Sequence, residues 1–481
     1  MKYRKLLVWS IIWMAGMIVA GSGLWPSVAA QTTGNITSRV SIGGGVQGNG
    51  RSNTPSISAD GRFVAFSSEA ANLVPNDTNK KADIFVYDRE TEQTSRVSVG
   101  SKGEEGNGHS FSPSISADGN LVAFASDADN LVANDTNGPC GVCGTDVFVY
   151  DRQAKQISRV SVGPNGLQGN RYSEHPAISA DGNFVAFSSW ADNLVSNDTN
   201  YQADIFVYDR QKGQTSRVSV GPNGTQSKDG SAHPSISADG SFVAFESWAR
   251  NLVPNDTNDW LDVFVHNRKT GQTSRVSVNS NGNQGNKISF APSISADGRY
   301  VAFGSESDNL VPNDNNKVKD VFVHDRETGK TIRASVDSNG GQAYNWSGGA
   351  VISPDGRFVA FESWADQLVP GDTNGRGDVF IRDWQGGVTA RVSIGTGGGQ
   401  GDEWSHHAAI SRGGLFVAFE SEATNLVPND TNLVADVFVH ARTEPVPPTM
   451  TPGTPTTPTV APTTTPDPAR IVLFLPVYFD N

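Results

Sequence analysis

The sequence is poor in cysteine. Its 481 residues include only Cys140 and Cys143, both in one short insertion over 138–144. A zinc site needs a second pair of ligands nearby, and none is evident in the sequence. A redox Cys-x-x-Cys motif usually opens a helix after a strand, and that context is missing. In an exported protein, we therefore expect a local disulfide between Cys140 and Cys143 that closes this loop.

Charged residues and helical patterns are also scarce. Asp, Glu, Lys and Arg make up 18% of the chain, whereas it contains 51 glycines and 25 prolines. Because helical periodicity is absent after the first thirty residues, the sequence predicts a turn-rich all-β protein. The formal net charge is −13. An acidic surface repels phosphate backbones, so we expect no nucleic-acid partner; the acidity suits cation binding or simply solubility.

Long apolar runs are missing except near the N-terminus. Three basic residues within the first five positions precede an apolar run over 6–20, and Val28-Ala29-Ala30 offers small residues for cleavage. This pattern predicts a signal peptide over 1–30 and a short leader over 31–36. An uncleaved anchor is the alternative, although the run is short for a membrane span. We therefore expect a secreted or extracytoplasmic protein with no transmembrane span in the mature chain.

One segment recurs seven times along the chain. Its first copy reads Ser-Ile-Ser-Ala-Asp-Gly-Arg-Phe-Val-Ala-Phe over 56–66, and a seventh copy over 410–419 has Gly413 in place of the aspartate. The copies are 58 residues apart except once, where the cysteine insertion makes the spacing 63. The aspartates of the Asp-Gly turns are Asp60, Asp118, Asp181, Asp239, Asp297 and Asp355.

Each copy contains four strand-like pieces, which we name a to d. In the first copy they cover 55–58, 63–67, 83–88 and 94–99, with Val and Phe alternating with small or polar residues. Tight turns join a to b and c to d, whereas longer loops join b to c and d to the next a. Four antiparallel strands per repeat form one blade of a β-propeller. The long loops emerge on one face, the long-loop face, where we expect any ligand to bind.

The two ends of the repeat region complement each other. The last copy stops after its strand c at 437–440 and lacks the Thr-Ser-Arg-Val-Ser strand d, which stands instead at 37–42. A ring gains from this split because pairing the termini leaves no exposed blade edge, whereas an open solenoid gains nothing. The sequence therefore predicts an all-β, seven-bladed β-propeller over 37–442, closed by the N-terminal strand in the last blade.

The repeat resembles those of TolB-type and WD40-like β-propellers. Their blades carry a Ser-x-Asp-Gly turn followed by an apolar strand, which reads Ser-Pro-Asp-Gly-Arg-Phe-Val-Ala-Phe over 353–361 here. The resemblance covers about 37–442 and implies the fold. It implies little about function, because this architecture serves scaffolds, receptors, lyases and peptidases alike.

The composition changes after the repeats. Residues 443–468 are rich in Pro and Thr, which predicts an extended linker. Residues 469–481 form a short apolar C-terminal tag that cannot span a bilayer. We interpret this tag as a signal for surface retention or export sorting; a strand that docks back on the propeller is the alternative.

The b–c loops repeat an Asp-x-Asn pattern and a further Asp that opens strand c. Oxygen side chains at i, i+2 and i+6 suit a structural Ca²⁺, but the additional ligands of an EF-hand loop at i+4 and i+11 are missing. Asx-turns and carboxylates that accept N–H bonds explain the same residues without metal. The residues are Asp77, Asn79, Asp83; Asp135, Asn137, Asp146; Asp198, Asn200, Asp204; Asp256, Asn258, Asp262; Asp314, Asn316, Asp320; Asp372, Asn374, Asp378; and Asp430, Asn432, Asp436.

Histidines recur at one position of strand a. The position lies three residues before the isoleucine of strand a. In copies one to seven it holds Thr54, Ser112, His175, His233, Ala291, Gly349 and His407. We expect these side chains to ring the mouth of the central channel, where some propeller-type lyases have histidines and a metal. No third ligand is apparent on a blade next to His175 and His233. His266, His324 and His440 replace Tyr87, Tyr150 and Tyr208 in strand c, so we expect them to pack inside the blades.

Aromatic residues recur at two loop positions of the long-loop face. Trp190, Trp248 and Trp364 follow strand b, and Tyr172, Trp346 and Trp404 lie in the d–a loop. If exposed, they form a stacking platform for sugars or an anchor for a protein partner. Packing between adjacent loops is the alternative.

The sequence shows no constellation for nucleophilic catalysis. A Gly-x-Ser-x-Gly motif is absent, and the d–a serine recurs in all seven copies, as expected for a structural residue. We therefore predict a monomeric, non-enzymatic binding or scaffold module whose partner is an extracellular protein or glycan. A propeller-type polysaccharide lyase, hydrolase or peptidase with its site at the channel mouth is the first alternative, and a structural envelope protein is the second.

Overall fold

The computed structural model describes residues 35–137 and 144–443. The predicted signal peptide, most of the leader, both cysteines, and the linker and tag over 444–481 lie outside the described residues. Among the described residues, no helix is long and apolar enough to cross a membrane.

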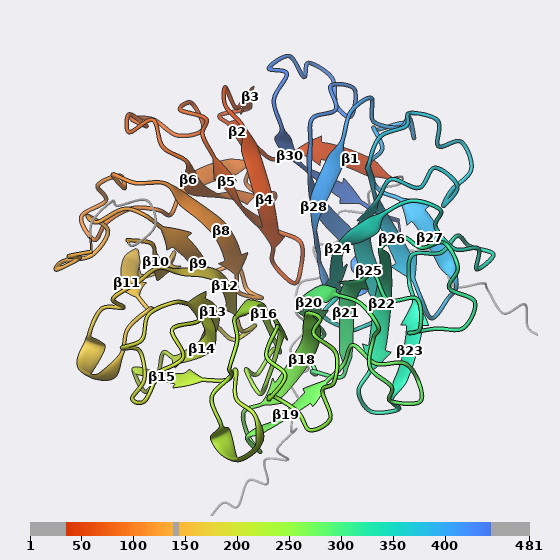
Figure 1. The fold of residues 1–481 in the computed structure, drawn as a ribbon. Coiled ribbons are helices and arrows are strands. Elements are labelled where there is room, and N and C mark those ends of the chain that lie inside the picture. The colour runs from red at the N-terminus through yellow and green to blue at the C-terminus, as the bar shows by residue number, and fades with distance from the viewer. Residues whose placement is uncertain (1–34, 138–143, 444–481) are drawn as a thin grey trace, which may run out of the picture. The chain divides into compact units, whose positions relative to one another are not determined.

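Over 35–137 and 144–443 the chain forms seven four-stranded antiparallel sheets, which are the blades of a propeller (Figure 1). The strands of blades 1 to 4, in the order a to d, are β4 (Ser52–Ile57), β5 (Phe63–Ser68), β6 (Asp83–Asp88), β7 (Gln93–Arg96); β8 (Ser110–Ile115), β9 (Leu121–Ser126), β10 (Asp146–Asp151), β11 (Gln156–Arg159); β12 (Ser173–Ile178), β13 (Phe184–Ser189), β14 (Asp204–Asp209), β15 (Gln214–Arg217); and β16 (Ser231–Ile236), β17 (Phe242–Ser247), β18 (Asp262–Asn267), β19 (Gln272–Arg275).

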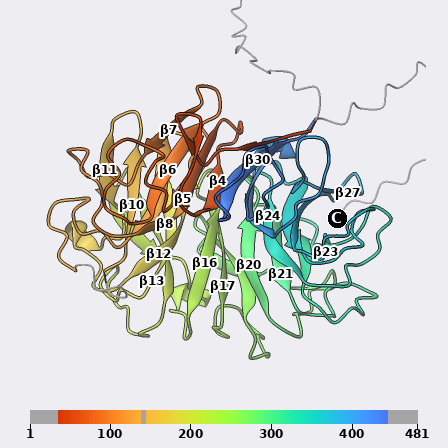
Figure 2. The same ribbon diagram turned by 90° about the horizontal axis from the view of Figure 1, so that it is seen from above.

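Blades 5 to 7 continue the ring. Their strands are β20 (Ser289–Ile294), β21 (Tyr300–Ser305), β22 (Asp320–Asp325), β23 (Lys330–Arg333); β24 (Ser347–Ile352), β25 (Phe358–Ser363), β26 (Asp378–Asp383), β27 (Val388–Arg391); and β28 (Ser405–Ile410), β29 (Phe416–Ser421), β30 (Asp436–Ala441), β1 (Ile36–Arg39). The loops contain a two-stranded ribbon of β2 (Ile42–Gly43) and β3 (Val46–Gln47) and the 3₁₀ turns η1 (Pro164–Gly166), η2 (Pro222–Gly224) and η3 (Arg412–Gly414). Figures 1 and 2 show β4, β8, β12, β16, β20 and β24 following one another around the ring.

Pairing of the two ends of the repeat region closes the ring, as the sequence predicts. β1 runs antiparallel to β30, with Thr37 opposite His440 and Arg39 opposite Phe438. The Ser41 hydroxyl donates to Asp436 at 2.5 Å, just as the hydroxyl of Ser98 donates to Asp83 in blade 1. The N-terminal strand therefore makes the contacts of a strand d, although it lies almost 400 residues from its partner in the sequence.

Strands a and d differ from the predicted bounds. In blade 1, strand a begins at Ser52 instead of 55. Ser52 and Asn53 also pair with strand b, on the far side of a β-bulge between Asn53 and Ser56. Strand d ends earlier, at Arg96 instead of 99. There the Ser98 side chain bonds to Asp83, and the chain turns into the next loop.

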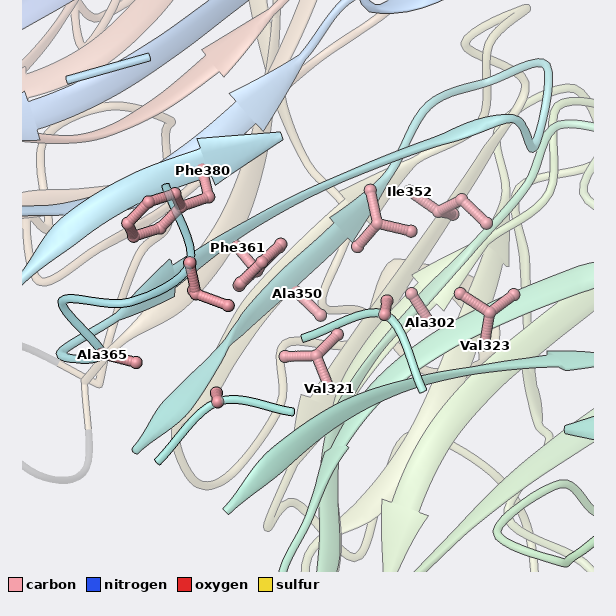
Figure 3. Close-up of a cluster of buried hydrophobic side chains, with 12 residues drawn as sticks. Ala302, Val321, Val323, Ala350, Ile352, Phe361, Ala365 and Phe380 are labelled. Carbon is pink, nitrogen blue, oxygen red and sulfur yellow. The ribbon is translucent and has the colours of Figure 1, made fainter. Parts of the chain in front are cut away.

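Buried side chains between neighbouring blades form the core. In each blade, phenylalanines of strands b and c pack together; the Phe66 and Phe85 ring centroids are 6.0 Å apart. Alanines and valines of one blade face the phenylalanines of the next. Figure 3 shows this for blades 5 and 6, where Ala302 and Val321 belong to the same cluster as Phe361 and Phe380. This close packing fixes the positions at which the loops leave the blades.

The three strand-c histidines pack inside blades, which confirms that expectation. His266, His324 and His440 are buried, and each Nδ1 lies 2.9 Å from a threonine hydroxyl of strand d. Burial lowers the pKa of each histidine to about 4. They are therefore neutral structural residues at physiological pH.

Candidate functional site: the long-loop mouth of the channel

The seven a strands contact one another in a closed ring around the channel. Each carries a β-bulge, and the bulged residue has a left-handed backbone: Thr54 (φ 47°), Ser112 (52°), His175 (52°), His233 (49°), Ala291 (48°), Gly349 (57°) and His407 (50°). Such a backbone is unfavourable for a residue other than glycine, above all for the β-branched Thr54. The closed ring therefore holds these residues in a conformation that they would not adopt alone.

At the short-turn end of the channel, the lining is apolar. A cavity of about 420 Å³ lies there, lined mainly by the last isoleucine of each a strand and by alanines of the a–b turns. Asp355 and Arg412 are its charged lining residues. The ionisable residues described next lie at the opposite, long-loop end, on strands a and b and just before β4.

Blades 3 to 5 contribute one histidine–carboxylate cluster to the long-loop mouth. His233 Nδ1 lies 2.8 Å from Glu246 Oε1, and the Ala291 amide of the next blade donates to the other Glu246 oxygen at 2.6 Å. The His175 ring centroid is 4.3 Å from that of His233. Glu246 raises the pKa of His233, whereas burial and the neighbouring His233 lower the pKa of His175 to about 4. The two imidazoles therefore differ in their tendency to take up a proton.

Blades 7 and 1 contribute a second cluster. Glu420 accepts bonds from Arg51 at 2.8 Å and contacts His406 Nε2 at 3.1 Å and His407 Nδ1 at 2.9 Å. Burial alone raises the pKa of Glu420, but these partners outweigh burial and hold the pKa well below its usual range. Burial raises the pKa of nearby Glu362. Two carboxyl groups with opposite pKa shifts thus lie at one side of the mouth.

The structure brings together only part of the predicted histidine set. His175 and His233 are in contact, whereas His407 belongs to the second cluster. Sequence reasoning missed His406, Arg51 and three glutamates. A signal was present: the fifth residue of strand b is Ser67, Ala125, Ser188, Glu246, Gly304, Glu362 or Glu420, in a segment that otherwise repeats closely.

His406, His407 and Glu420 also form a potential set of metal ligands. One donor atom from each lies within 4.8 Å of the others, and two imidazoles with a carboxylate suit Zn²⁺ or Mn²⁺. The donor set fits a metal in its chemistry. Arg51, however, already pairs with the Glu420 carboxylate and would compete with a metal for it.

The predicted aromatic residues divide into two groups. Trp248, Trp364 and Trp404 are exposed by 48%, 49% and 39%. The Trp364 and Trp404 rings lie 5.7 Å apart across adjacent blades. Tyr172, Trp190 and Trp346 are half-buried, and Tyr172 packs against Trp190 at 5.9 Å. Three tryptophans are thus available to a ligand, and the other aromatics support the loops.

The Asp/Asn loops surround an arginine of strand d. In blade 1, Arg96 Nη1 lies 3.4 Å from Asp77 and 3.2 Å from Asp83, while Asn79 donates to Asp83 at 2.9 Å and accepts from the Lys81 amide at 2.8 Å. The last bond is an Asx-turn, the metal-free alternative for this motif. The corresponding arginines, each paired with both aspartates of its blade, are Arg39, Arg159, Arg217, Arg275, Arg333 and Arg391.

Fold and mouth together define a seven-bladed β-propeller with an asymmetric long-loop face. Similar solved structures include an oligogalacturonate lyase in complex with manganese (13% identity, 86% of this chain, 95% of that chain, TM-score 0.51) and an oligogalacturonate lyase from Vibrio parahaemolyticus (12%, 86%, 95%, 0.50). They also include TolB from Acinetobacter baumannii (18%, 59%, 54%, 0.34). TolB proteins and other β-propellers are thus among the neighbours, as the repeat resemblance predicts, and at these identities the likeness shows the fold alone. No family model matches the chain, and the comparison with curated proteins gave no match.

The arginine-filled loops lead to a prediction about stability. Arg275→Ala leaves Asp256 and Asp262 as buried carboxylates without their cation and lowers the free energy of unfolding by about 3 kcal/mol. The control Arg250→Ala removes an exposed pair with Asp259 and costs less than about 0.5 kcal/mol. Adding EDTA leaves Tm in calorimetry unchanged. A drop in Tm that added Ca²⁺ reverses would instead support calcium in these loops.

Proposed function

We propose that the protein is an extracytoplasmic, non-enzymatic binding module that takes its partner on the long-loop face. The observation that carries this proposal is the distribution of exposed large hydrophobic residues. Of the eleven among the described residues, nine lie in the loops of this face: Val46, Leu167, Tyr201, Trp248, Trp260, Tyr344, Trp364, Trp404 and Leu433. Concentrating exposed apolar side chains on one face is typical of an interaction surface.

The variation among the seven repeats supports the same face. Apart from the fifth residue of each, strands b and c repeat almost unchanged because their side chains fill the spaces between blades. The residue before strand a, by contrast, is Arg51, His109, Tyr172, Gly230, Ile288, Trp346 or Trp404. A rigid repeated frame with variable residues around one mouth is the expected design for a binding site on loops.

Removal of the exposed tryptophans tests the proposal. In glycan and peptide arrays followed by biolayer interferometry, the triple variant Trp248→Ala, Trp364→Ala, Trp404→Ala weakens binding of any ligand found at least about tenfold, because exposed tryptophans act as anchors. Its Tm stays within about 2 °C of the parent, because these side chains contribute little to the core. Val388→Ala, which removes an exposed apolar residue of β27, is the matched control. Loss of binding in the control but not in the triple variant would contradict the proposal.

A second candidate function, metal-dependent catalysis at the mouth, is favoured by the cluster of His406, His407 and Glu420. A bound metal would act as a Lewis acid on a substrate oxygen. Calorimetric titration with Mn²⁺ and Zn²⁺ tests it. If the cluster is a metal site, His407→Ala abolishes binding and Arg51→Ala strengthens it, because Arg51 competes for Glu420. No heat of binding in either the parent or Arg51→Ala would rule out this candidate.

A further inference from the structure

We infer that the partner of the long-loop face presents a basic polypeptide segment, with several lysine or arginine side chains that bind between tryptophans and carboxylates. This inference rests on the proposed binding function and names the chemistry of its partner. It depends on the charges around the exposed tryptophans.

One position of the repeat carries only acids and tryptophans. The residue that follows strand b is Glu69, Asp127, Trp190, Trp248, Glu306, Trp364 or Glu422. In every blade its amide donates to the carbonyl of the residue before strand a, for example Glu69 to Arg51 at 2.9 Å and Trp364 to Trp346 at 2.9 Å. The backbone therefore fixes these seven side chains as one ring, which we call the acid–tryptophan ring.

A second set of carboxylates lies at the channel mouth inside this ring. Its members are Glu174, Glu246, Glu362 and Glu420, on strands a and b. Two fixed cations lie among the two sets: Arg51, bound to Glu420, and Lys319, 3.3 Å from Glu306. Eight carboxyl groups thus lie near two lysine or arginine side chains, and His233, His406 and His407 also contact Glu246 and Glu420. Among the described residues, Glu69, Asp127 and Glu422 form no salt bridge, so they carry the negative charge that is left for a partner. The mouth attracts cations and repels anionic ligands such as polyuronates.

The face already binds cations of its own chain in the proposed way. Arg376 lies over the Trp404 ring at 5.9 Å and pairs with Glu403 at 3.0 Å. Lys319 lies over the Phe290 ring at 5.1 Å while it pairs with Glu306. A cation over an aromatic face with a carboxylate beside it combines cation–π attraction with a charge-assisted hydrogen bond. Trp248 and Trp364 are exposed on the same face, and the acidic position of the blade between them is Glu306.

The exposed tryptophans also indicate an extended partner. Trp248 belongs to blade 4, whereas Trp364 and Trp404 belong to blades 6 and 7, with the acidic position of blade 5 between them. One small cation cannot contact both sides of the mouth. A flexible segment with repeated basic side chains reaches both.

Titration of the full chain with synthetic peptides tests the inference. We expect octalysine to quench tryptophan fluorescence with saturation, and octaglutamate and a glycine–serine octamer to have no effect. The apparent affinity falls at least about tenfold between about 0.05 M and 0.5 M salt, because screening weakens exposed charge pairs. The variant Glu69→Gln, Glu422→Gln and the variant Trp364→Ala each weaken octalysine binding at least about tenfold by calorimetry.

A matched control separates this site from general attraction to an acidic protein. Glu92→Gln, Glu327→Gln removes two charges from the c–d turns of the opposite face and leaves the octalysine affinity unchanged. Equal losses in the two double variants would overturn the inference. So would tighter binding of glucosamine oligomers than of octalysine, which would place the cation on a glycan.

The proposed function and this inference fail in different ways. A neutral glycan, polyuronate or neutral peptide that depends on Trp248, Trp364 and Trp404 would overturn the basic segment and leave the binding function standing. Binding of every ligand found to the opposite face would overturn both.

Discussion

The antiparallel ladder between β1 and β30 is the contact on which the ring depends. Without it, β30 would present an unpaired edge, and blade 7 would have three strands. The ladder is reinforced by the side chains that every other blade uses: Thr37 against His440, Ser41 against Asp436, and Arg39 between Asp430 and Asp436. A strand almost 400 residues away in sequence thus takes the place of a local strand d. The conformational entropy lost in bringing distant segments together is lost in this one blade, because the strands of the other blades are close in sequence.

The closed ring determines what the mouth can do. Because the a strands pack against one another on all sides, their bulged residues keep a left-handed backbone, and the residues beside them stay in a fixed order around the channel. Interblade packing tolerates little change, so variation is confined to positions where side chains leave the frame. The two histidine–carboxylate clusters and the exposed tryptophans occupy such positions. The blades thus share their strand framework and differ in the side chains that they place at the mouth.

The fold was predictable in detail, whereas the site was predictable only in outline. The repeat spacing and the tight a–b turns give the number of blades, because they are local patterns present in all seven copies. The split of the last blade between the two ends of the repeat region gives the closure. The contacts of Glu420 are different in kind. His406 and His407 lie beside it in blade 7, but Arg51 comes from blade 1, and sequence spacing does not show which side chains meet between blades. Arg96 and its equivalents repeat in every copy, so they read as ordinary strand residues until the structure places them between two aspartates.

The arrangement of the mouth residues depends on ring closure, which hydrogen–deuterium exchange with mass spectrometry tests directly. The amides of 36–41 should be protected to the same degree as those of the outer strands β7, β11 and β15, and should lose protection together with β30 as denaturant is added. Exchange of 36–41 at the rate of an unstructured peptide, while the other outer strands stay protected, would contradict a ring closed by this strand.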